Sequence, residues 1–497
     1  MTGDWMRALA AHLDRIRAAY PGDELCLVFD IDGTIVDTRH LVVHVLLAYD
    51  RRHNTTHFHG ITAEDVTAHE TRVDEILDPF ALPSRVRASV RTWYVEHARD
   101  PEAIAAAHRP YQGVLGVIRW FQLQPRTHVA LNTGRPESMR ELTLTSLNAL
   151  GRLHRVRFDP QLLFMHDGEG GSVEDAKVAG LGRLRDAGYR VAAVVDNEPS
   201  NIVAMAAADE HDEILYLHAD TIFASQRIPM PRALSGSAYA LSGLVDEAEL
   251  GRRVTFVWHG VNETQNLRQF MTSEVRWAEV DVRRDPLGRL VLRHDSFVQT
   301  PWRRDESPLL LADLLETLRW VGGRAAKLDL KEGGDVVDEV LDLARRFGFA
   351  DDELWFNASI ETLGESGFAR IRDDRPASIR SCPVDFLVPL LLGAPPAAEE
   401  VLALLAEWGV NRASLDWSTP GVRDALDLVE SLGWDVNLYG VPDLESFLEA
   451  ALLIPASVTA DFNFPEWHYY GRGAGRDGAF HRYDRADLQP DRTPVLH

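Results

Sequence analysis

Two aspartates one residue apart, Asp30 and Asp32, are the first candidates for chemistry in this 497-residue chain. They come directly after the apolar run 25–29 and are followed by Gly33. A buried parallel strand delivers its last residues to the edge of a sheet, where open α/β folds place their ligands. Because glycine takes backbone conformations that other residues avoid, a turn at Gly33 can bring both carboxylates to one substrate.

Three further polar residues stand at predicted strand ends or helix starts. Thr133 follows the predicted strand 128–131, Lys177 opens a helix, and Asp196 ends the predicted strand 191–195. A hydroxyl and backbone amides at a strand-to-helix turn can bind a phosphoryl oxygen. Taken singly, the segment 132–136 is also a common turn and Lys177 a common surface charge. Their order along the chain indicates one site.

These residues resemble the four motifs of the haloacid dehalogenase (HAD) superfamily, the first of which reads Asp-Ile-Asp-Gly-Thr at 30–34. The resemblance covers roughly residues 20–225. It implies that Asp30 attacks phosphorus to form an aspartyl-phosphate, while Asp32 protonates the leaving oxygen and later activates water. It also implies that Mg²⁺ is held by Asp30, Asp196 and the backbone carbonyl of Asp32, that Thr133 binds a phosphoryl oxygen, and that Lys177 neutralises the nucleophile and the phosphate. The presence of Asp32 favours phosphoester hydrolysis, because a dehalogenase has no alkoxide to protonate.

One position departs from the HAD pattern, because Asn197 stands where many members carry a second acid. Glu198, Asn201 or a water is then expected to complete the metal shell. The polar, helical segment 37–109 is predicted to be an inserted cap, within a HAD-like domain at 1–225. The histidines at 53, 57 and 59 lack nearby Cys or acid ligands, so a metal role is not favoured. The candidates for substrate selection in the cap are His40, Arg51, Arg52 and His57.

The second half of the chain has a different pattern of predicted strands and helices. After an irregular linker at 226–252, strand-like runs alternate with helical segments through 253–497. There are about eight such units, the number that closes a (β/α)₈ barrel. The predicted strands are 254–258, 277–282, 325–330, 354–359, 378–381, 413–417, 436–439 and 458–462.

Polar residues gather at the ends of the first strands of this predicted barrel, where catalytic residues of such barrels lie. Buried acids cluster only when a positive charge compensates them, and a divalent cation is the obvious candidate. Trp417, Asn437, Asp461 and Asn463 end later strands and can line the pocket. The gathered set consists of His259, Glu279, Asp281, His294, Asp329 and Lys331.

This set resembles the glycerophosphodiester phosphodiesterase and sphingomyelinase D superfamily, and more closely the menorin family. The similar stretches are Trp-His-Gly-Val-Asn at 258–262 and Lys-Leu-Asp-Leu-Lys at 327–331. The resemblance implies that the three acids bind Mg²⁺ or Ca²⁺, that His259 and His294 act as nucleophile or acid/base, and that Lys331 stabilises the phosphoryl charge. The Pro-Glu-Asn-Thr sequence of many glycerophosphodiesterases is absent after Gly260.

Composition bounds the function further. The net charge of −24 disfavours bulk binding to nucleic acid or anionic membranes, and no segment is long and apolar enough to span a bilayer. Two cysteines make a disulfide framework improbable, so a cytoplasmic protein is the simplest interpretation.

Two phosphoester sites on one chain predict a bifunctional hydrolase of small phosphoesters. The barrel would open a phosphodiester and the HAD domain would dephosphorylate the resulting monoester. Two alternatives stay open: a HAD phosphatase with a ligand-binding or regulatory barrel, and a nucleic-acid end-processing enzyme, which the acidic charge disfavours.

Overall fold

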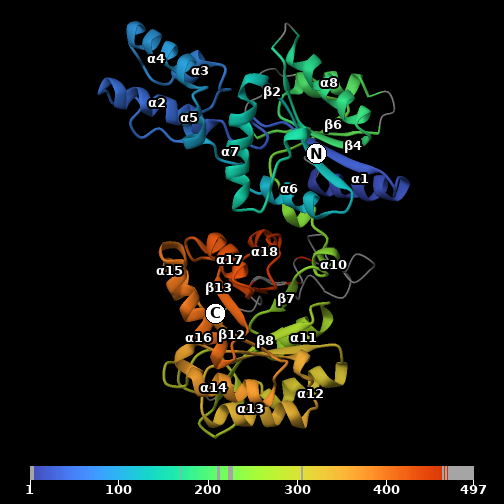
Figure 1. Cartoon of the computed structure of the whole chain (residues 1–497), viewed down its shortest axis with the longest axis vertical. Coiled ribbons are helices and arrows are strands. Elements are labelled where there is room, and N and C mark those ends of the chain that lie inside the picture. Colours follow the sequence, from blue (N-terminus) through green and yellow to red (C-terminus); the bar gives the residue numbers. More distant parts are fainter. Residues whose placement is uncertain are drawn as a thin grey trace. The chain divides into compact units, whose positions relative to one another are not determined.

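The computed structural model describes residues 5–168, 171–209, 213–221, 228–303, 306–461, 464 and 467. The chain divides into two compact units, Met1–Leu244 and Val245–His497 (Figure 1). Each unit is an α/β structure built on one parallel sheet, which is open in the first unit and closed in the second. The predicted fold class is thereby confirmed.

The first unit is built on a six-stranded parallel sheet in the order β3-β2-β1-β4-β5-β6. The central strand β1 is an apolar run because helices cover both faces of such a sheet, and its residues from 25 to 29 are buried. The strand β6 lies inside the segment 226–252 that was expected to be a linker. The strands are β1 Glu24–Phe29, β2 Thr127–Pro136, β3 Leu163–His166, β4 Tyr189–Asp196, β5 Leu215–Ala219 and β6 Ala233–Gly236.

Helix α1 (Trp5–Ala19) packs on this sheet through the apolar residues Trp5, Leu9, Leu13 and Ile16, which recur every three to four positions. The Trp5 indole donates to the Ala238 carbonyl (2.6 Å). The other helices of the sheet region are α6 Val114–Leu123, α7 Arg140–Arg152, α8 Val173–Asp186 and α9 Pro199–Ala207, with 3₁₀ turns η2 Glu137–Met139, η3 Pro160–Leu162 and η4 Leu241–Gly243.

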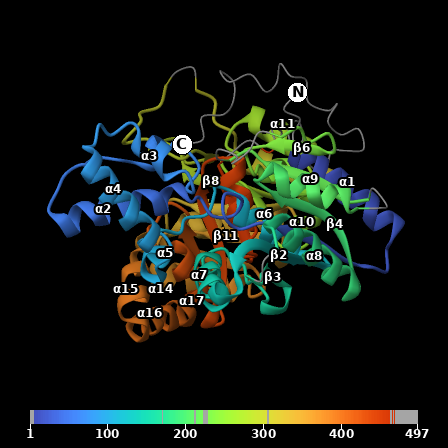
Figure 2. The ribbon, with the colours of Figure 1, turned by 90° about the horizontal axis from the view of Figure 1, so that it is seen from above.

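Four helices between β1 and α6 form the inserted cap and lie together in both views (Figures 1 and 2). They have an apolar core of their own, which includes Val42, Leu46, Phe58 and Tyr94. A separate core allows the cap to fold as a subdomain beside the sheet. Its elements are α2 Arg39–His53, η1 Ala63–Asp65, α3 Val73–Leu77, α4 Ser84–His97 and α5 Pro101–Ala107.

The second unit is a closed barrel of eight parallel strands, as the alternating pattern predicted. Each barrel strand pairs with the next, and the pairing of β10 with β8 closes the ring. The additional strand β9 (Leu290–Leu292) runs antiparallel to β8 and forms a hairpin. The barrel strands are β7 Thr255–Trp258, β8 Trp277–Arg284, β10 Ala325–Leu330, β11 Leu354–Asn357, β12 Ile379–Pro383, β13 Arg412–Asp416, β14 Asp435–Val441 and β15 Ser457–Ala460.

The helices of the second unit bury one stripe and expose charged residues on the other side. In α13, Val336, Val337, Val340, Leu341 and Ala344 are buried at helical spacing. Across the described residues, no helix is long and apolar enough to cross a membrane. The helices are α10 Glu247–Leu250, α11 Thr264–Thr272, α12 Leu311–Val321, α13 Asp335–Arg346, α14 Ile360–Asp374, α15 Val388–Gly393, α16 Pro395–Trp408, α17 Val422–Ser431 and α18 Leu444–Ala451, with 3₁₀ turns η5 Asp351–Glu353 and η6 Asp385–Leu387.

Candidate active sites

In the first unit, one buried lysine joins the carboxylates that end two neighbouring strands. Asp30 follows β1 and Asp196 ends β4, and these strands pair through Phe29 and Val195. The Nζ of Lys177 donates to Asp30 Oδ1 (2.7 Å) and Asp196 Oδ2 (2.6 Å). Burial raises the pKa of Asp30 to about 7, although the ammonium of Lys177 opposes that rise. The lysine thus offsets part of the cost of burying two acids.

A close approach between α8 and β2 sets the position of Lys177. The side-chain amide of Asn132 donates to the Lys177 carbonyl (2.8 Å). One turn further along α8, a Cβ on Gly180 would lie 2.6 Å from Asn132 Oδ1. A side chain at position 180 would therefore displace the Asn132 amide that holds Lys177.

The second aspartate of the motif is held by an arginine. Arg135, near the end of β2, donates twice to the Asp32 carboxylate, from Nε (2.7 Å) and Nη2 (2.6 Å). Burial raises the pKa of Asp32, but the guanidinium outweighs that effect and leaves the pKa below its ordinary value. Sequence reasoning assigned no role to Arg135, although it stands two residues after Thr133 in the predicted turn.

Two further residues surround this pair. His108 Nε2 lies 3.2 Å from Arg135 Nη2, and its Nδ1 lies 2.7 Å from Ser146 Oγ. Burial, with the nearby guanidinium, lowers the pKa of His108 to about 4. Thr133 is buried, and its hydroxyl accepts from the Arg135 amide (3.2 Å). His108 is therefore a neutral ring behind Arg135, and it was also missed from the sequence.

The oxygens that could hold Mg²⁺ converge next to Asn197. With its amide nitrogen turned toward them, Asn197 donates to Asp30 Oδ2 (3.2 Å) and to the Asp32 carbonyl (3.0 Å). The Glu198 amide and the Asn201 side chain donate to Asp196 Oδ1 (2.8 and 3.2 Å). Carboxylate and carbonyl oxygens make up the donor set, which fits a hard divalent cation.

One cap residue in electrostatic reach of this site, Glu70, was not among the candidates named from the sequence. Arg51, Arg52 and His57 are exposed, and His40 lies 3.8 Å from Asp37. Glu70, by contrast, accepts from the Thr38 hydroxyl (3.2 Å). Burial raises the pKa of Glu70, and the charge of Asp32 contributes to that rise.

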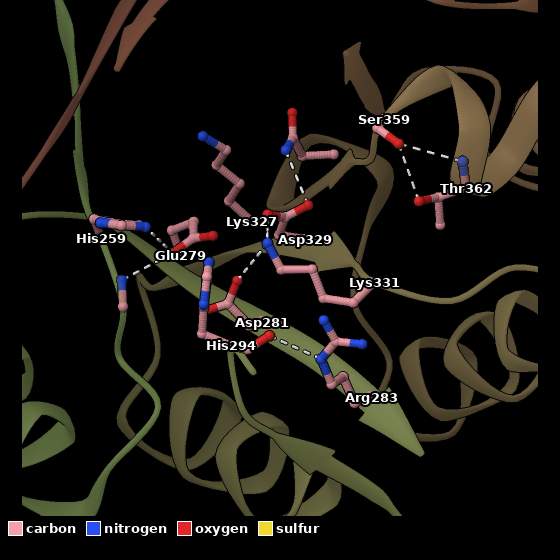
Figure 3. Close-up of polar contacts among 12 residues, drawn as sticks. His259, Glu279, Asp281, Arg283, His294, Lys327, Asp329, Lys331, Ser359 and Thr362 are labelled. Carbon is pink, nitrogen blue, oxygen red and sulfur yellow. Dashed lines mark hydrogen bonds and ion pairs between the residues drawn. The ribbon is translucent and has the colours of Figure 1, made fainter. Parts of the chain in front are cut away.

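In the second unit, three acids come together on the inward face of β8 and β10 (Figure 3). The register pairs Glu279 with Lys327 and Asp281 with Asp329. One carboxylate oxygen of each acid lies within 4.8 Å of the others. This oxygen-only set fits Mg²⁺ or Ca²⁺.

Lys331 compensates two of these acids. Its Nζ lies 2.8 Å from Asp281 Oδ1 and 2.5 Å from Asp329 Oδ2. Burial raises the pKa of Asp281, but the Lys331 ammonium outweighs it and lowers the pKa below its ordinary value. Two amides hold the remaining oxygens, since Asn262 donates to Asp281 Oδ2 (2.6 Å) and Asn357 to Asp329 Oδ1 (3.0 Å).

His259 lies between two acids where β7 ends. Its Nδ1 is 2.5 Å from Asp461 Oδ1, which follows β15, and its Nε2 is 3.6 Å from Glu279 Oε2. Burial lowers the pKa of His259, but Glu279 and Asp461 outweigh it and raise the pKa to about 9. The Gly260 amide donates to Glu279 (2.8 Å) and fixes that carboxylate beside the His259 ring.

The other predicted histidine lies at the rim. His294 is half exposed, and its Nδ1 lies 2.9 Å from Asp295 Oδ1. Figure 3 shows its ring beside Asp281. It lines the same cavity of about 340 Å³ as His259. Trp417 is held elsewhere, with Arg423 stacked 4.5 Å from its ring, and Asn463 lies outside the described residues. The cavity is lined by His259, Glu279, His294, Lys327, Asp329, Lys331, Asn357, Pro383, Ser414, Asn437, Tyr439, Gly440, Thr459 and Asp461.

The sequence matches no protein-family model and no curated protein. Its structure is similar to two kinds of solved structure. A glycerophosphodiester phosphodiesterase from Agrobacterium tumefaciens (16% identity, TM-score 0.30) covers 41% of this chain and 95% of its own. An Oleispira antarctica phosphodiesterase, solved with the product sn-glycerol-3-phosphate (16%, 0.33), covers 43% and 95%. A haloacid dehalogenase-like family hydrolase from Streptococcus pneumoniae (11%, 0.28) covers 41% and 87%.

Proposed function

We propose that the chain is a bifunctional, metal-dependent phosphoester hydrolase. The observation that carries this proposal is that each unit brings buried carboxylates together around one lysine at the carboxyl ends of its parallel strands. These are the edges where such folds bind ligands. In this proposal the barrel hydrolyses a phosphodiester, and the first unit removes the phosphate from the resulting monoester.

In the first unit Asp30 is the nucleophile and Asp32 the acid/base. Lys177 donates to Oδ1 of Asp30 (2.7 Å), so Oδ2, which accepts the longer hydrogen bond from the Asn197 amide (3.2 Å), is the oxygen offered to phosphorus. Arg135 keeps Asp32 ionised, which suits the activation of water in the second step. Protonation of the leaving oxygen in the first step requires the guanidinium to release Asp32, and an incoming phosphoryl group offers Arg135 other acceptors.

In the barrel, His259 and His294 act as nucleophile or acid/base, each on a different step of the reaction. Asp461 lies against Nδ1 of His259 and thereby turns Nε2 toward the acids. Lys331 supplies positive charge at the position where phosphoryl charge develops.

Each site has an oxygen donor set for one divalent cation. Asp30, Asp196 and the Asp32 carbonyl would hold Mg²⁺ in the first unit, and Glu279, Asp281 and Asp329 would hold Mg²⁺ or Ca²⁺ in the barrel. A bound cation supplies Lewis-acid polarisation of the phosphoryl oxygens.

Purified full-length protein with Mg²⁺ would be given bis(p-nitrophenyl) phosphate and p-nitrophenyl phosphate. Asp30→Asn should abolish monoester hydrolysis alone, and His259→Ala should abolish diester hydrolysis alone. Asp352→Asn, at an exposed carboxylate, is the matched control and should change neither activity. The absence of both activities, or variants that each leave both intact, would refute the proposal.

A second function is favoured by one observation. Lys331 already compensates Asp281 and Asp329, so the barrel acids are partly satisfied without a cation. On this alternative, the barrel is a ligand-binding or regulatory module beside a working phosphatase. Isothermal titration calorimetry with Mg²⁺ and with Ca²⁺, on the parent chain and on Asp281→Asn, separates the two functions. Loss of one bound cation in the variant supports the hydrolase, and an unchanged stoichiometry supports the module.

A further inference from the structure

The lysines of this chain are confined to its two candidate sites. Only three of its 52 lysine and arginine residues are lysines, at positions 177, 327 and 331. All the other residues of these 52 are arginines. Lys177 and Lys331 each join two carboxylates. Lys327 is the third, and neither the sequence nor the proposed mechanism gives it a role.

Within the described part of the chain, Lys327 is a buried ammonium without an ion-pair partner. Its side chain points into the barrel from β10, is 3% exposed, and lines the cavity. Among the described residues, no carboxylate lies within ion-pair distance of its Nζ; the contacts are the Thr459 hydroxyl (2.9 Å) and the Trp355 ring (4.6 Å). Figure 3 shows its side chain extending away from Asp329 and Lys331.

The surroundings hold this ammonium in place and leave it donors to spare. The Thr459 hydroxyl donates to Asn437 Oδ1 (3.0 Å), so toward Lys327 it acts as an acceptor. An ammonium has three N–H donors, and this contact uses one. The Trp355 ring face favours a cation but accepts no conventional hydrogen bond. Burial of a charge with unused donors is costly unless a ligand completes its shell.

We propose that Lys327 is a further substrate-binding residue, whose ammonium takes the anionic phosphoryl oxygen of a phosphodiester in the barrel cavity. This rests on the proposed function only in its choice of ligand. A lysine suits the position because its charge is compact, whereas the planar guanidinium used elsewhere in the chain needs room for five donors. Lys331 neutralises Asp281 and Asp329, whereas Lys327, four residues earlier in the chain, binds the ligand.

Because there are three lysines, the test can observe each of them directly. Full-length protein labelled with ¹³C at lysine Cε should give three lysine signals, and Lys327→Arg assigns one by its disappearance. With Mg²⁺ present, diethyl phosphate should shift the Lys327 signal, while neutral triethyl phosphate and acetate at equal concentrations should not. Lys327→Met should weaken diethyl phosphate binding at least tenfold, as expected for loss of a charge-assisted hydrogen bond.

Arg319→Met, which removes one exposed cation from α12 of the same barrel, should leave this affinity unchanged. The inference is overturned if diethyl phosphate leaves the Lys327 signal in place, or if triethyl phosphate or acetate shifts it equally. A shifted Lys327 signal in a protein that hydrolyses no diester would reject the proposed function and keep the binding role. Diester hydrolysis with an unshifted Lys327 signal, together with an unchanged KM in Lys327→Met, would keep the proposed function and reject the binding role.

Discussion

Removal of Lys177 should destabilise the first unit strongly, because two buried acids depend on it. Its Nζ lies 2.7 Å from Asp30 and 2.6 Å from Asp196, and the side chains of Lys177 and Asp196 are 2% and 1% exposed. In Lys177→Met the methylenes are largely replaced, so packing changes little. The loss is therefore mainly electrostatic.

Breaking a buried ion pair by removing one partner costs about 3–5 kcal/mol. For a unit of this size, each kcal/mol shifts the melting temperature by about 2–4 °C, so a fall of roughly 6–20 °C is expected. Differential scanning calorimetry of the full chain would measure it, with the transition of the second unit as an internal reference. Added Mg²⁺ should restore more stability to Lys177→Met than to the parent, since a cation can replace the ammonium.

A double variant makes the reasoning refutable. Lys177→Met with Asp196→Asn removes one of the stranded charges, so it should be more stable than Lys177→Met alone. The argument fails if Lys177→Met melts within about 2 °C of the parent, a shift of about 1 kcal/mol or less. It also fails if the second substitution adds a further loss of stability.

Three other outcomes are expected. Burial lowers the pKa of His108 to about 4, so as the pH falls the unfolded chain binds a proton at this residue before the folded chain does. The free energy of unfolding should therefore be greatest above about pH 6.5 and decline by about 3 kcal/mol toward pH 4. His108→Gln should flatten this decline in denaturant unfolding measured between about pH 6.5 and pH 4. Gly180→Ala places a Cβ 2.6 Å from Asn132 Oδ1 and should cost about 1–3 kcal/mol by urea unfolding. Asp461→Asn, which weakens the hold on His259, should lower diester kcat by about 10²-fold and leave monoester hydrolysis unchanged.

The barrel strands were predictable because a strand buried on both faces is an apolar run. All eight barrel strands were placed by strand-like runs that alternate with helical segments, with small differences at their ends, although Ser-Ile-Arg-Ser at 378–381 is largely polar. The strand β6 was not predicted, because Ala233–Gly236 is short, largely unburied and contains no β-branched or aromatic residue. An edge strand of this kind is specified by its pairing with β5, which the sequence does not display.

The site residues likewise divide into those that a local sequence pattern predicts and those that depend on pairing between distant parts of the chain. Asp30 and Asp196 stand at strand ends and Lys177 near a helix start, so local pattern was enough to select them. The pairing of Arg135 with Asp32 joins positions 103 residues apart and depends on where β2 ends relative to β1. Arg135 stands in the predicted turn two residues after Thr133, but the sequence does not show which carboxylate it pairs with.

The charges of the barrel cavity indicate an order of binding. At pH 8, above the pKa of about 7 that burial gives Glu279, the site holds four carboxylates: Glu279, Asp329 and Asp461 line the cavity, and Asp281 lies 2.8 Å from the Nζ of Lys331. Three cations oppose them, since the pKa of His259 is about 9 and two lysines are present. A phosphodiester anion therefore meets a site with one excess negative charge, and a divalent cation reverses that sign. Diethyl phosphate should bind at least tenfold more tightly with Mg²⁺ than with a chelator, whereas triethyl phosphate should not discriminate. Equal affinities for the anion in the two conditions would show that the lysines alone govern its binding.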